Sequence, residues 1–253
     1  MTPRVSLVVP AYEEGEHIMT CLDRIVDAVT VPFEVLVVYD RPDDSTAPYI
    51  AKFGDERVRG VLNEIGPGPA RAIRAGFAEA SAPTVVVTMA DGSDHLPLVD
   101  DLVRLVERGA VVAAGSRYMP GGAQVGGPVL KKWLSKGAGL SLFWLARVGT
   151  RDATNSYKAY SKDFIDEVGV EADAGFEVAI ELVAKARRLR RPVVELPTIW
   201  LDRTEGESRF RVRKWLPLYL RWYRFAFGPR LTPEQLRAAT AARGVHDDNG
   251  GSQ

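Results

Sequence analysis

The chain has 253 residues, which is enough for one α/β domain with a complete core. Its 33 Lys and Arg residues balance 33 Asp and Glu residues, so the net charge indicates no particular class of partner. The single cysteine, Cys21, excludes a disulfide framework within the chain and fits a reducing cytoplasm. We expect no signal peptide and no membrane-spanning helix, because no uncharged apolar run reaches about 18 residues.

Short apolar runs alternate with segments of helical periodicity in the first half of the chain. We predict strands at Val5–Val9, Phe33–Tyr39, Val58–Leu62, from Val85 onward, and at Ala110–Ala114. We predict helices through Ile18, Leu22, Ile25 and Val29, at Arg71–Ala80, and at Leu98–Arg108. This alternation is typical of a parallel, doubly wound sheet with helices on both faces.

The pattern changes after about Tyr118, and the second half is less regular. We expect a glycine-rich loop at Met119–Gly127, a helix at Val129–Val148, a polar then strand-like segment at Asp152–Tyr160, a helix at Glu177–Arg188 and a strand at Val193–Ile199. A polar loop (Arg203–Arg209) and an aromatic, basic segment (Phe210–Phe227) follow. We therefore predict one domain at 1–228, then a short helix and a disordered tail at 229–253.

Two carboxylates follow the strand that begins at Val85. Asp91 and Asp94 are separated by a Gly-Ser pair that can turn sharply, and neither Lys nor Arg stands beside them in the sequence. Ligands of open α/β sheets bind past the carboxyl ends of strands. Carboxylate oxygens are the ligands that Mg²⁺ and Mn²⁺ prefer, so these residues are a candidate metal site. In the alternative interpretation, Asp94 caps the following helix and Asp91 is a solvated turn residue.

Five short motifs follow one another along the chain: Pro10–Glu14, Tyr39–Thr46, Gly66–Ala70, Asp152–Lys158 and Arg203–Arg209. In this order they resemble glycosyltransferase family 2, in the branch of dolichyl-phosphate and polyprenyl-phosphate mannose synthases, and the resemblance covers about residues 3–212. It implies a GT-A fold, a Rossmann-like α/β domain whose mostly parallel central sheet is flanked by helices. It also implies a Mg²⁺ or Mn²⁺ cofactor.

The sequence departs from the family pattern in two places. Glu13 replaces an Asn in the first motif. At the metal strand the family has Asp-Ala-Asp, whereas Ala90 and Gly92 occupy the two acidic positions here if no gap is allowed. Asp91 is then one residue out of register, and Asp94 takes the position of a third ligand.

The resemblance also implies roles for individual residues. The donor nucleotide is assigned to Pro10, Tyr12, Glu14, Asp40, Gly66, Gly68, Ala90 and Asp91, and the metal to Asp91 and Asp94. The acceptor phosphate is assigned to Arg117, Lys131, Ser135, Arg203 and Arg209, and catalysis to Asp91, Asp94, Asp152 and Arg203. The alternatives are a helix-entry turn for Tyr12 and Glu14, a plain loop for Gly66–Ala70, and a solvated basic face for Lys132 and Lys136.

The resemblance implies an inverting transfer of a hexose to a polyprenyl phosphate, with GDP-mannose as the first-choice donor and a UDP-sugar such as UDP-glucose as the alternative. An anionic acceptor needs no general base, whereas a soluble hydroxyl acceptor needs one, for which Asp152 and Glu181 are candidates. A nucleotide-sugar-binding protein without turnover is the remaining alternative.

The region from Lys185 to Arg230 contains 13 Lys and Arg against 4 Asp and Glu. Its basic residues alternate with Trp215, Leu218, Tyr219, Trp222, Tyr223 and Phe225. This composition suits a segment that lies on an anionic bilayer, so we expect a peripheral protein on the cytoplasmic face of the membrane. In the alternative, this helix packs on the domain or on a second subunit, with Pro217 as a kink. Nucleic acid is not expected, because the sequence lacks its recognition motifs.

Overall fold

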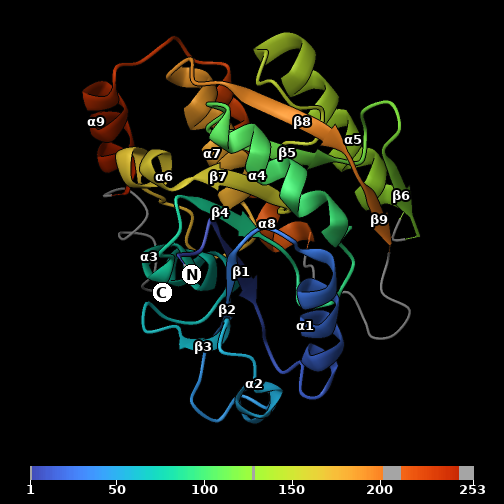
Figure 1. Cartoon of the computed structure of the whole chain (residues 1–253). Helices are drawn as coiled ribbons and strands as arrows, with labels where there is room; N and C mark the ends of the chain where they lie inside the picture. The colour runs from blue at the N-terminus through green and yellow to red at the C-terminus, as the bar shows by residue number, and fades with distance from the viewer. Residues whose placement is uncertain (1, 127–128, 202–211, 245–253) are drawn as a thin grey trace.

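The computed structural model describes residues 2–126, 129–201 and 212–244, with the backbone alone at 129–131, 212–215 and 241–244. A seven-stranded sheet in the order β3-β2-β1-β4-β7-β5-β8 forms the centre of the molecule (Figure 1). Its strands are β1 (Val5–Pro10), β2 (Phe33–Tyr39), β3 (Val58–Leu62), β4 (Thr84–Val87), β5 (Val112–Ser116), β7 (Lys158–Ser161) and β8 (Val193–Pro197). The strands pair in parallel except β7, which is antiparallel to both β4 and β5. The mostly parallel sheet is confirmed; the inserted antiparallel strand was not anticipated.

A second, two-stranded sheet joins β6 (Ala123–Val125) to β9 (Ile199–Leu201). The sequence predicted a loop for the first of these and one continuous strand, Val193–Ile199, in place of β8 and β9. The structure breaks that strand at Thr198, whose amide donates to Ser116 O at 3.1 Å and whose carbonyl accepts from Ala123 N at 2.9 Å. The chain therefore changes sheets at this residue.

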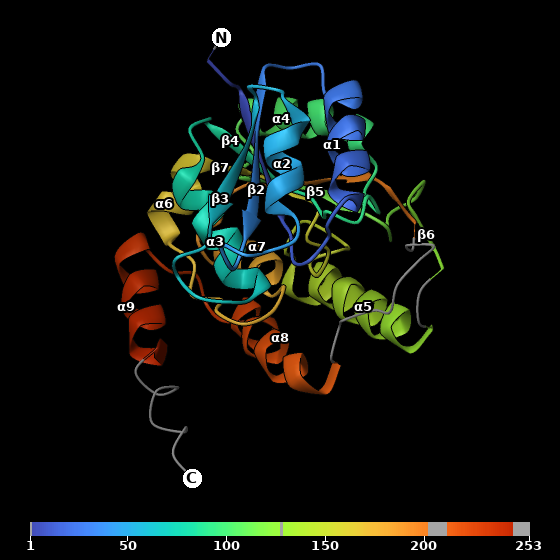
Figure 2. The ribbon, with the colours of Figure 1, turned by 90° about the horizontal axis from the view of Figure 1, so that it is seen from below.

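Helices cover both faces of the large sheet, as Figure 2 shows. They are α1 (His17–Ala28), α2 (Ala47–Phe53), α3 (Pro69–Glu79), the 3₁₀ turn η1 (Leu96–Leu98), α4 (Val99–Glu107), α5 (Val129–Ser141), the π-helical turn η2 (Leu142–Ala146), α6 (Lys162–Val168), α7 (Val178–Arg188), α8 (Val212–Ala226) and α9 (Pro233–Gly244). One core cluster lies against α1 and α4, and the other against α3, α6, α7 and α8. In β1, Leu7 and Val9 face the first cluster and Val8 the second, which is the period-two alternation of a strand buried on both faces.

The aromatic residues of α8 do not all lie where an interfacial helix would place them. Trp222 and Phe225 are 2% and 3% exposed and belong to the core, and Tyr219 and Tyr223 pack against it. The prediction that Trp222 and Phe225 contact the membrane is therefore wrong, because this domain covers both side chains. Among the helices of the described residues, none combines the length and apolar composition needed to cross a bilayer.

Candidate active site

The residues expected to bind substrates follow the carboxyl ends of neighbouring strands. Glu14 lies beyond β1, Asp40 beyond β2, Asp91 and Asp94 beyond β4, and Arg117 beyond β5. Because parallel strands end at the same edge of a sheet, this order places the five side chains along one edge, where open α/β sheets bind ligands.

The first predicted donor turn is tied to the loop after β2. The amides of Glu13 and Glu14 donate to Asp44 Oδ2 at 3.2 Å and to Thr46 Oγ1 at 3.1 Å. Glu13 has φ of 52°, in the left-handed region where Asn is favoured over Glu, and its carboxylate pairs with Arg41. Tyr12 is 46% exposed at the edge, and Arg41 Cζ lies 5.9 Å from the centre of its ring.

Asp40 organises the second predicted donor turn. Its Oδ1 accepts from Asn63 Nδ2 at 2.7 Å, and its Oδ2 accepts from the amide of Gly68 at 2.9 Å. Gly66 and Gly68 both have φ of 126°, a conformation that requires glycine. Asn63 was missed by the sequence analysis; its position at the end of β3 was the available signal.

The carboxylate of Asp94 points back toward the end of β4. Its Oδ2 accepts from Thr88 Oγ1 and from the amide of Met89, both at 3.0 Å. The residue before η1 is His95, which makes no side-chain cap, so the alternative in which Asp94 caps a helix is wrong. Burial raises the pKa of Asp94 to about 6, and the negative charge of Asp91 adds to the effect.

Asp91 lies half-buried in the same turn, where its Oδ1 accepts from the amide of Ser93 at 3.0 Å. Cations do approach this turn from other elements: Arg24 of α1 donates to Gly92 O at 2.5 Å, and the charge of Arg117 acts on Asp94. Across the part of the chain that the structure describes, no three His, Cys, Asp or Glu side chains form a metal site by themselves. Two neighbouring carboxylates nevertheless fit Mg²⁺ or Mn²⁺, because such ions complete their shell with water and substrate phosphates.

Arg117 and Asp152 form a buried, bidentate ion pair on the other half of the edge. Arg117 Nε donates to Asp152 Oδ2 at 2.7 Å, and Nη2 donates to Oδ1 at 2.9 Å. The Asp152 side chain is fully buried, and that of Arg117 is 11% exposed. Although burial opposes it, the guanidinium holds the pKa of Asp152 below its ordinary value, so the carboxylate stays charged.

The same cluster contains predicted and unpredicted residues. Arg117 Nη2 lies 3.4 Å from Ser135 Oγ of α5, which in turn lies 2.6 Å from Thr154 Oγ1. Lys158 is completely buried and donates to the carbonyls of Asp152 and Asn155. Burial lowers the pKa of Lys158 to about 7, although the charge of Asp152 opposes this. Thr154 and Lys158 belong to a recognised motif, but no role was predicted for them.

The remaining predicted site residues lie away from this edge or outside the described part of the chain. Lys131 lies in α5, where the structure describes only its backbone, and Arg203 and Arg209 lie outside the described residues. Glu181 is fully buried in α7, where it accepts from the amides of Glu171 and Ala172 at 2.7 Å and pairs with Lys185. The prediction of Glu181 as a candidate general base is therefore wrong, because its carboxylate is enclosed within its own domain.

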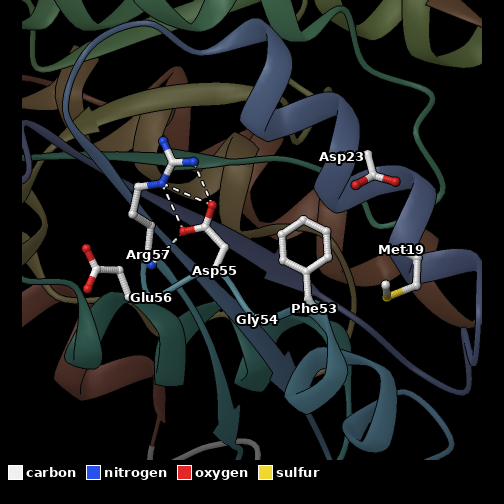
Figure 3. Close-up of a pocket in the computed structure, with 7 residues that line it drawn as sticks. All are labelled: Met19, Asp23, Phe53, Gly54, Asp55, Glu56 and Arg57. Atoms are coloured by element: carbon white, nitrogen blue, oxygen red, sulfur yellow. Dashed lines mark hydrogen bonds and ion pairs between the residues drawn. The ribbon is translucent and has the colours of Figure 1, made fainter.

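A pocket of about 620 Å³ lies away from these residues (Figure 3). It is lined by Met19 and Asp23 of α1 and by Phe53–Arg57 between α2 and β3. The Asp55 carboxylate there is held by Arg57 Nη2 at 2.6 Å. Because this pocket opens beside the amino end of β3, it is separate from the edge described above.

Sequence comparison finds relatives over most of the chain. The model of "Glycosyl transferase family 2" matches residues 6–169. A polyprenol monophosphomannose synthase of Mycolicibacterium smegmatis is 30% identical over 85% of this chain and 87% of that protein. An undecaprenyl-phosphate mannosyltransferase of Micrococcus luteus is 31% identical over 81% of this chain and 87% of that protein. A dolichol-phosphate mannosyltransferase of Pyrococcus furiosus is 28% identical over 82% of this chain, and the match spans 59% of that protein.

Solved structures show the same fold. Glucosyl-3-phosphoglycerate synthase of Mycobacterium tuberculosis, crystallised with Mn²⁺, uridine diphosphate and glucosyl-3-phosphoglycerate, gives a TM-score of 0.64 at 17% identity over 91% of this chain and 82% of that one. A second complex of that enzyme, with Mg²⁺ and uridine diphosphate, gives a TM-score of 0.66 at 18% identity over 91% of this chain and 81% of that one. The expected GT-A fold is confirmed, and relatives and fold together support glycosyltransferase activity. The chain belongs to glycosyltransferase family 2.

Proposed function

We propose that this protein transfers a mannosyl group from a nucleoside diphosphate, with GDP as the first choice, to the phosphate of a polyprenyl lipid. The mannosyltransferase relatives support the sugar and the acceptor class. The observation that carries the proposal is the division of the sheet edge, with carboxylates beyond β1, β2 and β4 and the Arg117–Asp152 pair beyond β5. Such an edge suits a metal-bound diphosphate on one side and a second anion on the other.

On the donor side, Asp40 and Glu14 offer carboxylates to ribose hydroxyls or a base edge, and Tyr12 offers an exposed ring. Asp91 and Asp94 would hold Mg²⁺ or Mn²⁺. When bound, such an ion stabilises the negative charge that develops on the departing diphosphate. Arg24 holds the Gly92 carbonyl at 2.5 Å and so fixes the turn that carries both acids.

On the acceptor side, Arg117 presents a fixed cation at the end of β5. Asp152 accepts from Nε and Nη2 and sets the plane of the guanidinium, and Ser135 Oγ also lies 3.4 Å from Nη2, so the Nη1 donors are the ones we assign to a phosphate. An oxygen of that phosphate attacks the anomeric carbon while the bond to the diphosphate oxygen breaks, so the anomeric centre inverts. The acceptor is already anionic, so catalysis consists of positioning and charge stabilisation.

The acceptor also implies a place of action. A polyprenyl chain partitions into a bilayer, so the proposal includes peripheral association with the cytoplasmic face of the membrane. A UDP-sugar donor is the second candidate, because the structural neighbours were crystallised with uridine diphosphate.

The test incubates the protein with GDP-mannose or UDP-glucose, a short polyprenyl phosphate, and Mn²⁺ or Mg²⁺, and detects glycolipid by mass spectrometry. We expect product from GDP-mannose, and its loss in Asp91→Ala/Asp94→Ala. Asp101→Ala is the matched control, since that carboxylate on α4 is 56% exposed. Product from UDP-glucose alone would reject GDP-mannose as the donor. Full activity of the double variant would reject Asp91 and Asp94 as the metal ligands. Donor binding without turnover would reject the proposed transfer reaction.

A further inference from the structure

Arg71 lies in the first turn of α3, and only part of its guanidinium is paired. Its Nε and Nη2 donate to the two carboxylate oxygens of Asp173 at 2.8 Å and 2.5 Å. Within the described part of the chain Nη1 has no hydrogen-bond partner, and the side chain is 32% exposed. A guanidinium carries five N–H donors, so Nη1 and the second hydrogen of Nη2 form an unpaired edge. We call it the open edge of Arg71.

The open edge lies against the second predicted donor turn. A Cβ built on Gly66 would lie 2.9 Å from Arg71 Nη1, so this nitrogen occupies the space that a side chain at position 66 would need. Hydrogen bonding to Asp173 raises the pKa of Arg71, and the negative charge of Asp40 adds to the effect, so Asp40 lies within electrostatic range. Gly66 and Asp40 are both predicted to bind the donor nucleotide. Arg71 therefore brings a cation to the donor site that the sequence analysis did not identify.

The plane of the Arg71 guanidinium is fixed by the loop that carries Asp173. The amides of Asp173 and Ala174 donate to Glu177 Oε1, both at 3.3 Å, and the amide of Gly175 donates to Glu177 Oε2 at 2.8 Å. Glu177 is buried, so a carboxylate inside the domain anchors this loop. Asp173 thus serves as a positioning residue, because it holds one edge of the guanidinium and leaves the other edge toward the donor turn.

The position of Arg71 in the sheet favours the base of the nucleotide over its phosphates. Arg71 follows β3, whereas the carboxylates assigned to the metal follow β4, and the strand order is β3-β2-β1-β4. Three steps between neighbouring strands correspond to about 14 Å. A diphosphate bound by a metal at Asp91 and Asp94 would therefore lie at the other end of the donor site, with the nucleoside extending toward β3.

Among the bases, guanine matches the open edge best. Guanine presents two neighbouring acceptors, O6 and N7, and bidentate binding of both by arginine is the commonest specific contact with this base. Uracil has acceptor oxygens on either side of its N3–H donor, so two parallel N–H groups cannot bond both. Adenine has an amino donor where guanine has O6, and that donor would face the donors of Arg71.

We propose that the open edge of Arg71 binds O6 and N7 of guanine and makes the donor site selective for a guanine nucleotide. This inference rests on the proposed function and deepens it, because it assigns the choice of base to one side chain. Arg71 would otherwise only join α3 to the loop at Asp173. In that case its removal would lower stability and change the affinity for every nucleotide alike.

The test measures binding of GDP and UDP by calorimetry in Mg²⁺, without acceptor. We expect Arg71→Ala to lose at least about tenfold in affinity for GDP, and to change less than about twofold for UDP. Arg71→Lys should lose as much as Arg71→Ala for GDP, since lysine keeps the charge but cannot bind two acceptors in one plane. Arg74→Ala is the matched control, because Arg74 is 31% exposed and donates to the same Asp173 at 3.1 Å from one turn further along α3. Equal losses for GDP and UDP, or the same loss in Arg74→Ala, would overturn the proposal.

A modified nucleotide tests the same contact in the unaltered protein. In 7-deaza-GDP a C–H group replaces N7, so the wild type should bind it at least about fivefold more weakly than GDP, whereas Arg71→Ala should bind the two equally. Equal binding of GDP and 7-deaza-GDP by the wild type would contradict the contact with N7.

The outcomes separate this inference from the proposed function. Glycolipid formed from GDP-mannose, together with an unchanged preference for GDP in Arg71→Ala, would reject the role of Arg71 and keep the proposed transfer. A preference for GDP that disappears in Arg71→Ala, in a protein that forms no glycolipid, would keep the role of Arg71 and reject the proposed transfer. Tighter binding of UDP than of GDP by the wild type would overturn the guanine selectivity itself.

Discussion

Replacing Asp152 by Asn tests how far the acceptor side depends on its buried ion pair. Asn has nearly the same shape and keeps an oxygen that can accept from the Arg117 amide, now 3.0 Å from Asp152 Oδ2. It removes the negative charge that faces the Arg117 guanidinium, whose Nε and Nη2 lie 2.7 Å and 2.9 Å from the Asp152 carboxylate oxygens. The Arg117 guanidinium is then buried without a counter-charge.

The size of the effect follows from burial. Removing one partner of a buried ion pair costs about 3–5 kcal/mol, because the remaining charge stays desolvated. Asp55 provides the comparison: Arg57 holds it in the same bidentate way (Figure 3), but the two side chains are 20% and 41% exposed. An exposed pair contributes about 0.2–1 kcal/mol. The two Asp→Asn changes should therefore differ by at least about 2 kcal/mol.

The assay is urea unfolding followed by circular dichroism, in which the two variants and the wild type are compared at pH 7.5. A difference of about 2 kcal/mol changes the ratio of folded to unfolded protein about thirtyfold. Arg117→Met in the Asp152→Asn background should recover part of the loss, because it removes the unpaired charge. Equal unfolding free energies for Asp152→Asn and Asp55→Asn would refute the argument that burial decides the strength of this pair.

Two further outcomes follow from Lys158 and Gly68. The unfolded chain keeps the Lys158 proton up to about pH 10 whereas the folded chain releases it near pH 7, so the free energy of unfolding should rise between these values by at most about 5 kcal/mol. Urea unfolding of Lys158→Met should lack this rise, and the same pH dependence in both proteins would contradict the assignment. Gly68→Ala should destabilise by about 1–3 kcal/mol, because φ is 126° and its Cβ would lie 3.3 Å from Ala174 O. Gly137→Ala, at a helical glycine whose added Cβ would meet no atom within 4 Å, should instead stabilise the protein by about 0.5–1 kcal/mol. Thermal unfolding measures both glycine variants. A stability change of the same sign in both would contradict the backbone strain at Gly68.

Some elements could be predicted closely because local sequence determines them. Phe33–Tyr39 and Val58–Leu62 are strands with the predicted bounds, since each is a β-prone run between turn residues. The antiparallel β7 could not be predicted, because strand direction depends on contacts that are distant in sequence. The helix predicted to continue to Val148 becomes a π-helical turn and ends at Ala146, where Arg147 takes φ of 56°.

The candidate site was predictable in part, because its residues lie in short motifs of the sequence. The resemblance named Asp40, Gly68, Arg117 and Asp152 individually and did not predict their contacts. In the structure the Gly68 amide donates to Asp40, and Arg117 donates to Asp152. The resemblance did not identify a role for Lys158, the first residue of β7, whose burial and backbone partners become visible only in the fold. The aromatic side of α8 was ambiguous, because a face covered by the domain and a face covered by lipid have similar compositions.

The distribution of charge across the sheet edge explains why a neutral chain suits two anionic substrates. The carboxylates beyond β1, β2 and β4 would repel a diphosphate, so that half requires a divalent ion between protein and donor. The half beyond β5 needs none, since the Arg117 guanidinium lies there. Metal removal should therefore weaken donor binding far more than acceptor binding, and calorimetry with each substrate in EDTA would measure this. Equal loss of both would mean that one ion serves both substrates and that the charge division has no functional role.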